Sequence, residues 1–591
     1  MKIVGTTQAS GGRRQSILAS AFALALLAGC GDDDSQQTGP SGFEAPREPV
    51  NLGGSGDLFQ SNRVLDVEVS MDPGEFSALS AEGRTLASTG RECLSDFEYT
   101  EYSAIVTIDG VRMDEVVIRK KGYLGSLSPS LPSLKLDFND KWDGRTYQGS
   151  TGLTLNNNRQ DPSNARQCLA FDQFREAGIA APRCNYARVS VNGQSLGIFT
   201  NVEAINKPFL ARVFGDDDGN LYEAQTADFG QWLSQRFEKK TNEKANDRSD
   251  LQAVSEALSL PDDQLLNVLP QLVNLDRFIR FWAVETLLGA WDSASGNANN
   301  FHIYRNPADG LFHFIPWGAD TAFRGEHPIK PGTGVLYRNF SLANRLFDIP
   351  EYRARYEAEL SELLATQWNE DALMQSLEDI RQLTGTSEQA AASVRAFITG
   401  TPTGDKVRLS RRLAIEEAIA APSDVPSFPL DDNEPDCPAP VTTPLTGTVS
   451  ALNGVDQGSF KFTLPNGRQV DASLTFAAFE VDSLVYSVDT ETSPEVISLL
   501  LIGADVTDAF TPYVLQLFIE SSDYVPGTHQ LHGFATTALL FAVDDSAPGQ
   551  VRTLALGAGG SITLRRIGTP DRPGDVELTL NATLEYGVDA L

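Results

Sequence analysis

The pattern of the chain changes at about residue 446. Beyond this point the apolar segments are short and rich in β-branched residues, as in "VISLLLIG" and "YVLQLFIE", and an Asn466-Gly467 hairpin turn separates two others. Before it, residues 422–445 are rich in Pro and Asp and continue no periodic pattern. A chain of 591 residues is also too long for one ordinary domain. We therefore predict a linker over 422–445 and an all-β sandwich or barrel over 446–591, with the role of an accessory or binding module.

The region before the linker mixes strands and helices. "RVLDVEVSM", "SAIVTIDG", "EVVIRKKG" and "SLKLDFND" have the alternation and the β-branched content of strands. "DPSNARQCLAFDQFREAG" is typical of a helix that Asp161 or Ser163 caps and Gly178 ends. "NYARVSVNGQSLGIFTNVEA" predicts a hairpin, and helices dominate from about residue 206 to 290. The fold class of this region is therefore predicted to be α+β.

The first thirty residues have the features of an export signal. Two arginines precede an apolar run that is too short to be a good membrane span, and the run ends in "LAGC", which resembles a bacterial lipobox. The resemblance implies cleavage before Cys30 and lipidation of its thiol, whereas the alternative is an ordinary secretory signal with an incidental cysteine. We predict a lipoprotein signal peptide over 1–29 and a flexible tether over 30–57. Lipid alone would then attach the protein to the bacterial cell envelope, at the outer membrane or the cell surface.

Charge and cysteine content narrow the choice of partners. The formal net charge is −32, so the chain will not hold a nucleic-acid backbone by general attraction. With Cys30 lipidated, an even number of cysteines remains, which permits up to two disulfides and three full pairings. These four cysteines are Cys93, Cys168, Cys184 and Cys437. Their spacing fits no zinc knuckle.

The stretch "WDSASGNANNFHIYRNPADGLFHFIPWGAD" carries the candidate chemistry. Asp292 and Asn297 have the D-x-x-x-x-N spacing of a kinase catalytic loop, and a predicted hairpin then returns the chain to Asp320. In kinases the first Asp accepts the proton of the substrate hydroxyl, while the Asn and a second Asp hold the metal. Upstream, "KKGYLGSLSPS" is a Gly/Ser loop between strands that begins at Gly122, and Lys135 on the next strand would pair with phosphates. The order of these elements therefore favours phosphoryl transfer.

Each of these elements also has an explanation without chemistry. Asp292 can cap a turn, asparagines are typical loop formers, and Lys135 can be a solvated strand residue. "GQSLG" (193–197) matches the G-x-S-x-G nucleophile motif, but it lies between two predicted strands and not in a strand-turn-helix context. We therefore interpret "GQSLG" as a hairpin tip. The turn "GDDDGN" either holds calcium or is solvated.

Several segments resemble the spore coat protein H (CotH) kinase family, in family order, over about residues 60–345. They are "VVIRKKGYLGS…PSLKLDF", the block from "LTLNNNRQ" to "NVEAINKPFL", "GNLYE", and "WDSASGNANNFHIYRNPADGLFHFIPWGADTAF". The resemblance implies an atypical protein-kinase-like domain, which we place at 58–421. It also implies transfer of the ATP γ-phosphate to Ser/Thr hydroxyls of secreted or surface proteins, with Mg (or Mn/Ca). It does not extend to 446–591.

The motifs assign a role to individual residues of this sequence. The predicted catalytic residue is Asp292, the predicted nucleotide-binding residues are Lys135, Gly122 and Arg119, and the predicted metal ligands are Asp320, Asn300 and Asn297.

Two departures from the family pattern bear on activity. The family commonly reads P-W-D-x-D where this chain has "PWGAD", so the first carboxylate is replaced by Gly318. The predicted helix carries "RQ" where the family often has Arg-Glu, so the glutamate partner of the lysine is missing or displaced to Glu176 or Glu203. The alternative to an active kinase is therefore a catalytically inactive kinase-like surface lipoprotein that acts as a structural or binding module.

Overall fold

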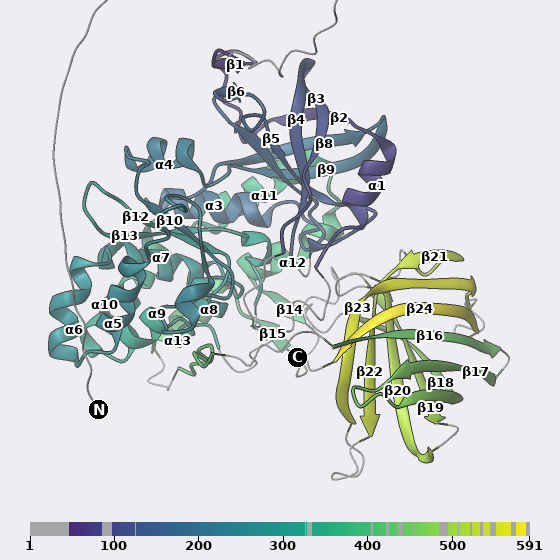
Figure 1. Ribbon diagram of the computed structural model, residues 1–591. Helices are drawn as coiled ribbons and strands as arrows, with labels where there is room; N and C mark the ends of the chain where they lie inside the picture. The colour runs from purple at the N-terminus through teal and green to yellow at the C-terminus, as the bar shows by residue number, and fades with distance from the viewer. Residues whose placement is uncertain are drawn as a thin grey trace, which may run out of the picture. The chain divides into compact units, whose positions relative to one another are not determined.

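A computed structural model provides the three-dimensional structure of the chain (Figure 1). The residues it describes are 47–84, 97–123, 126–325, 327, 334–403, 406–420, 425–434, 441–452, 454–483, 495–505, 508–520, 523–531, 536–543, 551–568 and 575–586.

The described chain begins with a closed β-barrel, drawn in purple to blue in Figure 1. Its strands, in the order in which they pair, are β2 (Val64–Ser70), β3 (Tyr102–Ile108), β4 (Val111–Lys121), β5 (Ser133–Asp137), β7 (Gly152–Asn156), β9 (Gln194–Val202) and β8 (Cys184–Val191). Alternate residues such as Leu134 and Leu136 are fully buried in the core of this barrel, as the period of a strand requires. The strands predicted in this region are confirmed, and "GQSLG" lies at the tip of the β8–β9 hairpin.

Ordered structure begins before residue 58, where the predicted tether ends. Strand β1 (Val50–Leu52) pairs in parallel with β6 (Arg145–Tyr147), and Leu58 is buried in the barrel core. The helix α1 (Pro73–Ala81) follows β2, with Asp72 as its N-cap.

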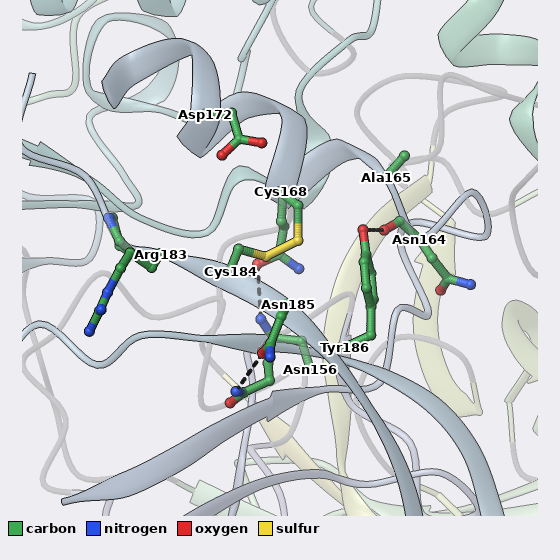
Figure 2. The surroundings of a disulfide bond; sticks show 12 residues. Asn156, Asn164, Ala165, Cys168, Asp172, Arg183, Cys184, Asn185 and Tyr186 are labelled. Atoms are coloured by element: carbon green, nitrogen blue, oxygen red, sulfur yellow. Dashed lines mark hydrogen bonds between the residues drawn. A yellow bond between two sulfur atoms is a disulfide. The ribbon is translucent and has the colours of Figure 1, made fainter. Parts of the chain in front are cut away.

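Helix α3 (Arg166–Glu176) begins at a buried cap, as the sequence predicts. The Asp161 carboxylate accepts the backbone N–H of Arg166 (2.8 Å), and Gly178 follows the helix with a φ of +72°. A disulfide joins Cys168 on this helix to Cys184 at the start of β8, as Figure 2 shows. This pair is one of the predicted possibilities, whereas Cys93 and Cys437 lie outside the described residues.

The part that follows the barrel combines a four-stranded sheet with helices. The sheet order is β11 (Phe237–Lys239), β10 (Asn220–Ala224), β12 (Phe301–Arg305) and β13 (Phe312–Pro316). Strands β12 and β13 form the predicted hairpin. Strands β10 and β11 lie in the region where helices were predicted, because "NLYEA" is short and becomes a strand by pairing with the edge of that hairpin.

The helices of this part surround one large hydrophobic core, except that Phe209 and Leu210 of the first helix lie in a smaller cluster with Leu221, Tyr304 and Ile315. They are α4 (Lys207–Phe214), α5 (Ser249–Leu258), α6 (Asp262–Val268), α7 (Leu275–Leu287), α8 (Ala294–Asn297), α9 (Ser341–Phe347), α10 (Pro350–Thr366), α11 (Glu370–Thr384), α12 (Glu388–Thr399) and α13 (Arg411–Ala420), with 3₁₀ turns η2 (Leu233–Arg236), η3 (Leu269–Gln271) and η4 (Ala319–Thr321). A short strand pair, β14 (Thr401–Thr403) and β15 (Lys406–Arg408), follows α12. Within the described ranges, no helix combines the length and the apolar character needed to cross a membrane.

Part of the predicted linker packs against the helical core. Val425 and Leu430 contact that core, the Phe428 N–H donates to Asn339 Oδ1 (2.7 Å), and Asp432 accepts three backbone N–H groups. The described residues 425–434 are therefore not a free spacer.

The chain ends in an all-β region with a core of its own, green to yellow in Figure 1. It is a nine-stranded sheet in which a β23–β24 pairing closes eight of the strands into a barrel, so the structure decides between the predicted sandwich and barrel. The strands are β16 (Val441–Leu452), β17 (Val455–Thr463), β18 (Gln469–Ser483), β19 (Glu495–Asp505), β20 (Asp508–Glu520), β21 (Gly527–Gln530), β22 (Thr537–Val543), β23 (Val551–Arg566) and β24 (Val576–Tyr586). The predicted Asn466-Gly467 turn joins β17 to β18.

Candidate active site

Three asparagine side chains converge on the carboxylate of Asp292. Asn297 and Asn299 donate their amide N–H to Asp292 Oδ1 (2.9 and 3.0 Å), and Asn300 donates to Asp292 Oδ2 (2.9 Å). Asp292 is half-buried at the end of the segment that follows α7. The asparagine cluster thus fixes the orientation of the carboxylate. Because each amide nitrogen points to Asp292, each amide oxygen, the atom suited to bind a cation, points away from it. We call residues 292–300 the Asp292 loop.

A buried glutamate on α7 holds this loop through two hydrogen bonds. Glu285 accepts the backbone N–H groups of Ala294 (3.1 Å) and Ser295 (2.8 Å) at the start of α8. Burial raises the pKa of Glu285 to about 7, although the hydrogen bonds from Ser295 and Ala294 act in the opposite direction. Sequence reasoning missed Glu285, because a single glutamate in an amphipathic helix carries no signal that it is buried.

Asn300 connects the Asp292 loop to the turn that carries Asp320. Its amide also donates to the backbone oxygen of Asp292 (2.9 Å), while its own backbone oxygen accepts the N–H of Trp317 (3.0 Å) at the end of β13. Burial and the charge of Asp292 raise the pKa of Asp320 to about 6, and the Lys121 charge acts against them. The charge of Asp292 therefore acts on the Asp320 carboxyl, and a cation bound by both carboxylates would relieve this repulsion.

Gly318, where the resemblance led us to expect an aspartate, lies in the turn before Asp320. Its φ is +49°, and a Cβ built on it would lie 2.4 Å from Asn300 Oδ1. A side chain at 318 would therefore force Asn300 to move, although Asn300 is held by Asp292. The space that a side chain at position 318 would need is thus taken by the neutral amide oxygen of Asn300.

Three cationic side chains lie on the outer face of the first barrel. Lys135 on β5 is paired in register with Arg119 on β4, and Lys121 lies two residues further along β4. Burial, followed by Arg119, lowers the pKa of Lys135. Burial lowers the pKa of Lys121 to about 8, while Asp320 and Glu223 raise it. Of the two predicted phosphate-side cations and Lys121, it is Lys121 whose pKa is coupled to Asp320. Lys121 could have been identified from the sequence, because side chains two residues apart in a strand lie on the same face, and Lys121 follows Arg119 at that spacing.

Lys121 reaches helix α3 through two amides. Its Nζ donates to Asn156 Oδ1, and Asn156 Nδ2 donates to Gln167 Oε1 (2.9 Å). Gln167 is buried, and its Nε2 atom has no hydrogen-bond partner among the described residues. A neutral amide relay therefore connects the lysine to the helix where kinases use a Lys–Glu ion pair.

Neither glutamate predicted as a displaced lysine partner takes that role. Glu203 forms ion pairs with Arg183 (2.8 Å) and Arg212 (2.6 Å), and Glu176 accepts a hydrogen bond from Gln173 (2.7 Å). Neither glutamate is therefore placed as a partner of the lysine, since Glu203 pairs with two arginines and Glu176 bonds to an amide of its own helix.

A carboxylate on β10 faces the lysines instead. Burial alone would raise the pKa of Glu223, but Lys240, His302 and Lys135 outweigh it and hold the pKa at about 2. Lys240 Nζ lies 2.9 Å from Glu223 Oε2, and His302 Nε2 lies 3.9 Å from the same oxygen. Burial lowers the pKa of His302 to about 4, so this histidine is neutral at physiological pH. The sequence analysis gave no role to Glu223, since only its pairing opposite His302 brings it to the site.

The remaining predicted site residues differ in how the structure places them. Gly122 has a φ of +124° and its carbonyl accepts the hydroxyl of Tyr99 (2.8 Å), so the Gly/Ser loop leaves β4 at a position that favours glycine. Cys30 lies outside the described residues. Among the described residues, the one group of three acidic, histidine or cysteine side chains spaced for a metal is Asp216, Asp217 and Asp218, in the "GDDDGN" turn.

The residues brought together fit a metal-bound nucleotide. Asp292 and Asp320 supply carboxylate oxygens, and Asn297 and Asn300 supply amide oxygens, which are the hard donors that Mg²⁺ and Ca²⁺ take. Lys121, Lys135 and Arg119 present positive charge from the barrel face. Hard oxygen donors and cationic side chains, the kinds of group that phosphoryl transfer uses, are therefore both present in this part of the chain.

Comparisons with known proteins find similarity to one family. Residues 118–407 match the family model described as CotH kinase protein. Inner spore coat protein H of Bacillus subtilis is 28% identical over 255 residues, which cover 40% of this chain and 70% of that protein. Invasin CotH3 of Rhizopus delemar is 24% identical over 244 residues, and invasin CotH2 of the same organism is 23% identical over 242. Each match covers 36% of this chain, but only 40% and 41% of the two Rhizopus proteins. Residues 118–407 are therefore similar to the CotH kinase family, and the chain is similar to the Bacillus protein.

Proposed function

We propose that this protein is an exported, lipid-anchored, CotH-like protein kinase that transfers the γ-phosphate of ATP to Ser/Thr hydroxyls of secreted or surface proteins. One observation carries the proposal. Asn300 ties the Asp292 loop to the turn before Asp320, so that two carboxylates share a site beside Lys121. The family match supports a nucleotide-dependent kinase.

Phosphoryl transfer depends on positioning and charge neutralisation more than on covalent chemistry. When bound, the metal–nucleotide supplies the phosphoryl group. Asp292 orients the acceptor hydroxyl and takes its proton as the oxygen–phosphorus bond forms and ADP leaves. Asp320, with the amide oxygens of Asn297 and Asn300, holds the cation. Lys121 aligns the phosphates from the barrel side, with Lys135 and Arg119 next to it.

The alternative function is a catalytically inactive surface module. It is favoured by the neutral Asn300 amide, which stands against Gly318 where the family commonly has a carboxylate. Loss of one negative charge weakens cation binding, because the charge of its ligands sets the affinity of a hard ion site. The phosphoryl-transfer assay described next separates the two functions.

A phosphoryl-transfer assay with matched lysine variants tests the kinase proposal. Purified protein is incubated with γ-labelled ATP and Mg²⁺, Mn²⁺ or Ca²⁺, and autophosphorylation and nucleotide affinity are measured. Lys121→Ala is expected to weaken nucleotide binding by at least about 10-fold and by more than Lys135→Ala, because Lys121 is the lysine coupled to Asp320. Lys141→Ala serves as the control, since Lys141 is exposed and pairs only with its neighbour Asp140.

The inactive module predicts a different result in the same assay. Wild-type protein would then show no transfer and no calorimetric ATP binding with any of the three metals, and the lysine variants would be indistinguishable from the control. Transfer by the wild type that survives Lys121→Ala unchanged would contradict the assigned role of Lys121.

Lipid anchoring is a separate proposal that rests on the "LAGC" segment at Cys30. The disulfide between Cys168 and Cys184 supports export, since such bonds persist in oxidising compartments. Cys30→Ser is expected to leave the precursor uncleaved or to release the protein from membranes. Mass spectrometry of the native N-terminus checks this, and an unmodified first residue other than Cys30 would refute the anchor.

A further inference from the structure

We propose that residues 425–434, which we call the strap, position the Asp292 loop for catalysis. This inference rests on the proposed kinase function and extends it to a segment beyond the family match, which ends at residue 407. The sequence predicted a linker here, yet the strap makes backbone hydrogen bonds to two segments that each hold the Asp292 loop.

The first connection runs through Asn339. The strap donates the N–H of Phe428 to Asn339 Oδ1 (2.7 Å). Asn339 is 1% exposed and donates its amide to the oxygen of Gly296 (2.7 Å) and its backbone N–H to the oxygen of Ser295 (2.8 Å). Both acceptors lie in α8, so one buried side chain joins the strap to the middle of the Asp292 loop.

The second connection runs through η2. The carboxylate of Asp432 accepts the backbone N–H groups of residues 231–233 (2.6, 2.9 and 2.8 Å), at the start of that turn. At its far end, the side chain of Arg236 donates to Thr226 Oγ1. A carboxylate that accepts several N–H groups fixes the start of a helical turn, because those donors have no partner inside the turn.

Thr226 and its neighbour then contact the asparagine cluster directly. The N–H of Thr226 donates to Asn299 Oδ1 (3.1 Å), and the N–H of Ala227 donates to the oxygen of Ala298 (2.9 Å). Asn299 in turn donates to Asp292 Oδ1. The strap therefore supports the loop from both sides, through Gly296 and through Asn299.

Release of the strap is expected to affect transfer more than nucleotide binding. The residues it supports orient Asp292, which faces the acceptor hydroxyl. Within the described part of the chain, no hydrogen bond joins the strap to the cations of the barrel face. Misorientation of a catalytic group lowers kcat, because positioning contributes a large part of the rate. The strap residues are positioning residues and not catalytic ones.

Two variants release the strap from opposite sides. Asp432→Ala removes the acceptor from the strap. Gly230→Ala removes space on the partner side, since a Cβ on Gly230 would lie 2.1 Å from Asp432 Oδ1, and the backbone of Gly230 is not in the left-handed region. Asp431→Ala is the matched control, because the hydrogen bonds of the neighbouring Asp431 go only to Asn433 within the strap.

Both releasing variants are expected to lower kcat about 5- to 10-fold and to leave the Kd for Mg–ATP within about 2-fold of wild type, while the control changes neither. The double variant is expected to match the single variants, because each disrupts the same contact. Unchanged kcat in both single variants, or losses that multiply in the double variant, would overturn the proposal.

Hydrogen exchange separates this inference from the kinase proposal. Amides of Asn297 and Ala298 are bonded within the loop, to Ser293 and Ala294. Faster exchange at residues 293–300 in Gly230→Ala and Asp432→Ala, against Asp431→Ala, would support the strap even if the wild type transfers no phosphate. Unchanged exchange there would overturn the strap, whatever the activity of the protein.

Discussion

Asp320→Asn is expected to abolish metal-dependent nucleotide binding and, in the same protein, to raise the melting temperature without metal. The carboxylate is the hard oxygen donor that a divalent cation needs, so affinity for Mg–ATP should fall by at least about 100-fold. Without the cation, however, burial and Asp292 make this carboxylate costly, and they raise its pKa to about 6. A neutral amide of the same shape removes that cost, so the melting temperature is expected to rise by roughly 2–4 °C.

The same pKa fixes the sign of the pH dependence. The folded state holds the Asp320 proton up to about pH 6, whereas the unfolded chain loses it near the ordinary aspartate pKa of 3.8. The stability contributed by this group therefore falls as pH rises between these values. Metal binding has the opposite trend, since the cation competes with that proton and binds poorly below about pH 6. Calorimetric titrations and melting curves at pH 5 and pH 7.5, with Asp309→Asn as the control at the other end of the hairpin, check both trends. Metal binding that is equal at the two pH values would contradict the assignment of Asp320 as a ligand.

Asp292→Ala is expected to reduce phosphate transfer by about 10²- to 10⁴-fold, which is the usual contribution of a positioned acid–base group. Stability is also expected to fall, because the amides of Asn297 and Asn299 lose their acceptor in the variant and that of Asn300 keeps only the backbone oxygen of residue 292. Hydrogen bonds to a charged group contribute about 1.5–3 kcal/mol each, part of which water replaces. The melting temperature should therefore fall by at least about 4 °C.

The exposed Asp276, which pairs with Arg355 on the surface, provides the control for this experiment. Asp276→Ala is expected to keep both transfer and melting temperature, since exposed ion pairs contribute little. Full transfer activity in Asp292→Ala would contradict the assigned role. A variant that only unfolds, in a protein whose wild type binds no ATP, would show that Asp292 is a structural cap.

Local patterns predicted the parts of the site that depend on neighbours in sequence. The hairpin from Phe301 to Pro316 follows from alternation around a turn, and its return brings Asp320 toward Asp292. The cap of α3 at Asp161 and the turn at Gly193 are local for the same reason.

The supports of the site could not be predicted in this way. Lys121 contacts Asn156, which is 35 positions later, and Asn339 contacts Gly296 across 43 positions. The spacing within a strand shows on which face of the sheet a side chain lies. It does not show which side chain of another element that residue contacts. The strap was missed for a further reason, since Pro and Asp content is typical both of free linkers and of segments whose backbone groups bond to a neighbouring surface.

The disulfide on α3 makes completion of the fold depend on the compartment in which the chain is found. Cys168 follows Gln167, the last amide in the relay to Lys121, so the bond to Cys184 fastens the helix next to the residue that the relay uses (Figure 2). In a reducing cytoplasm this bond would stay open, and under the proposed export it would close after the chain had crossed the membrane. A kinase built in this way would complete its maturation outside the compartment in which it is made. The proteins of the producing cell would then be spared during synthesis, while those that share the oxidising compartment would meet the finished enzyme.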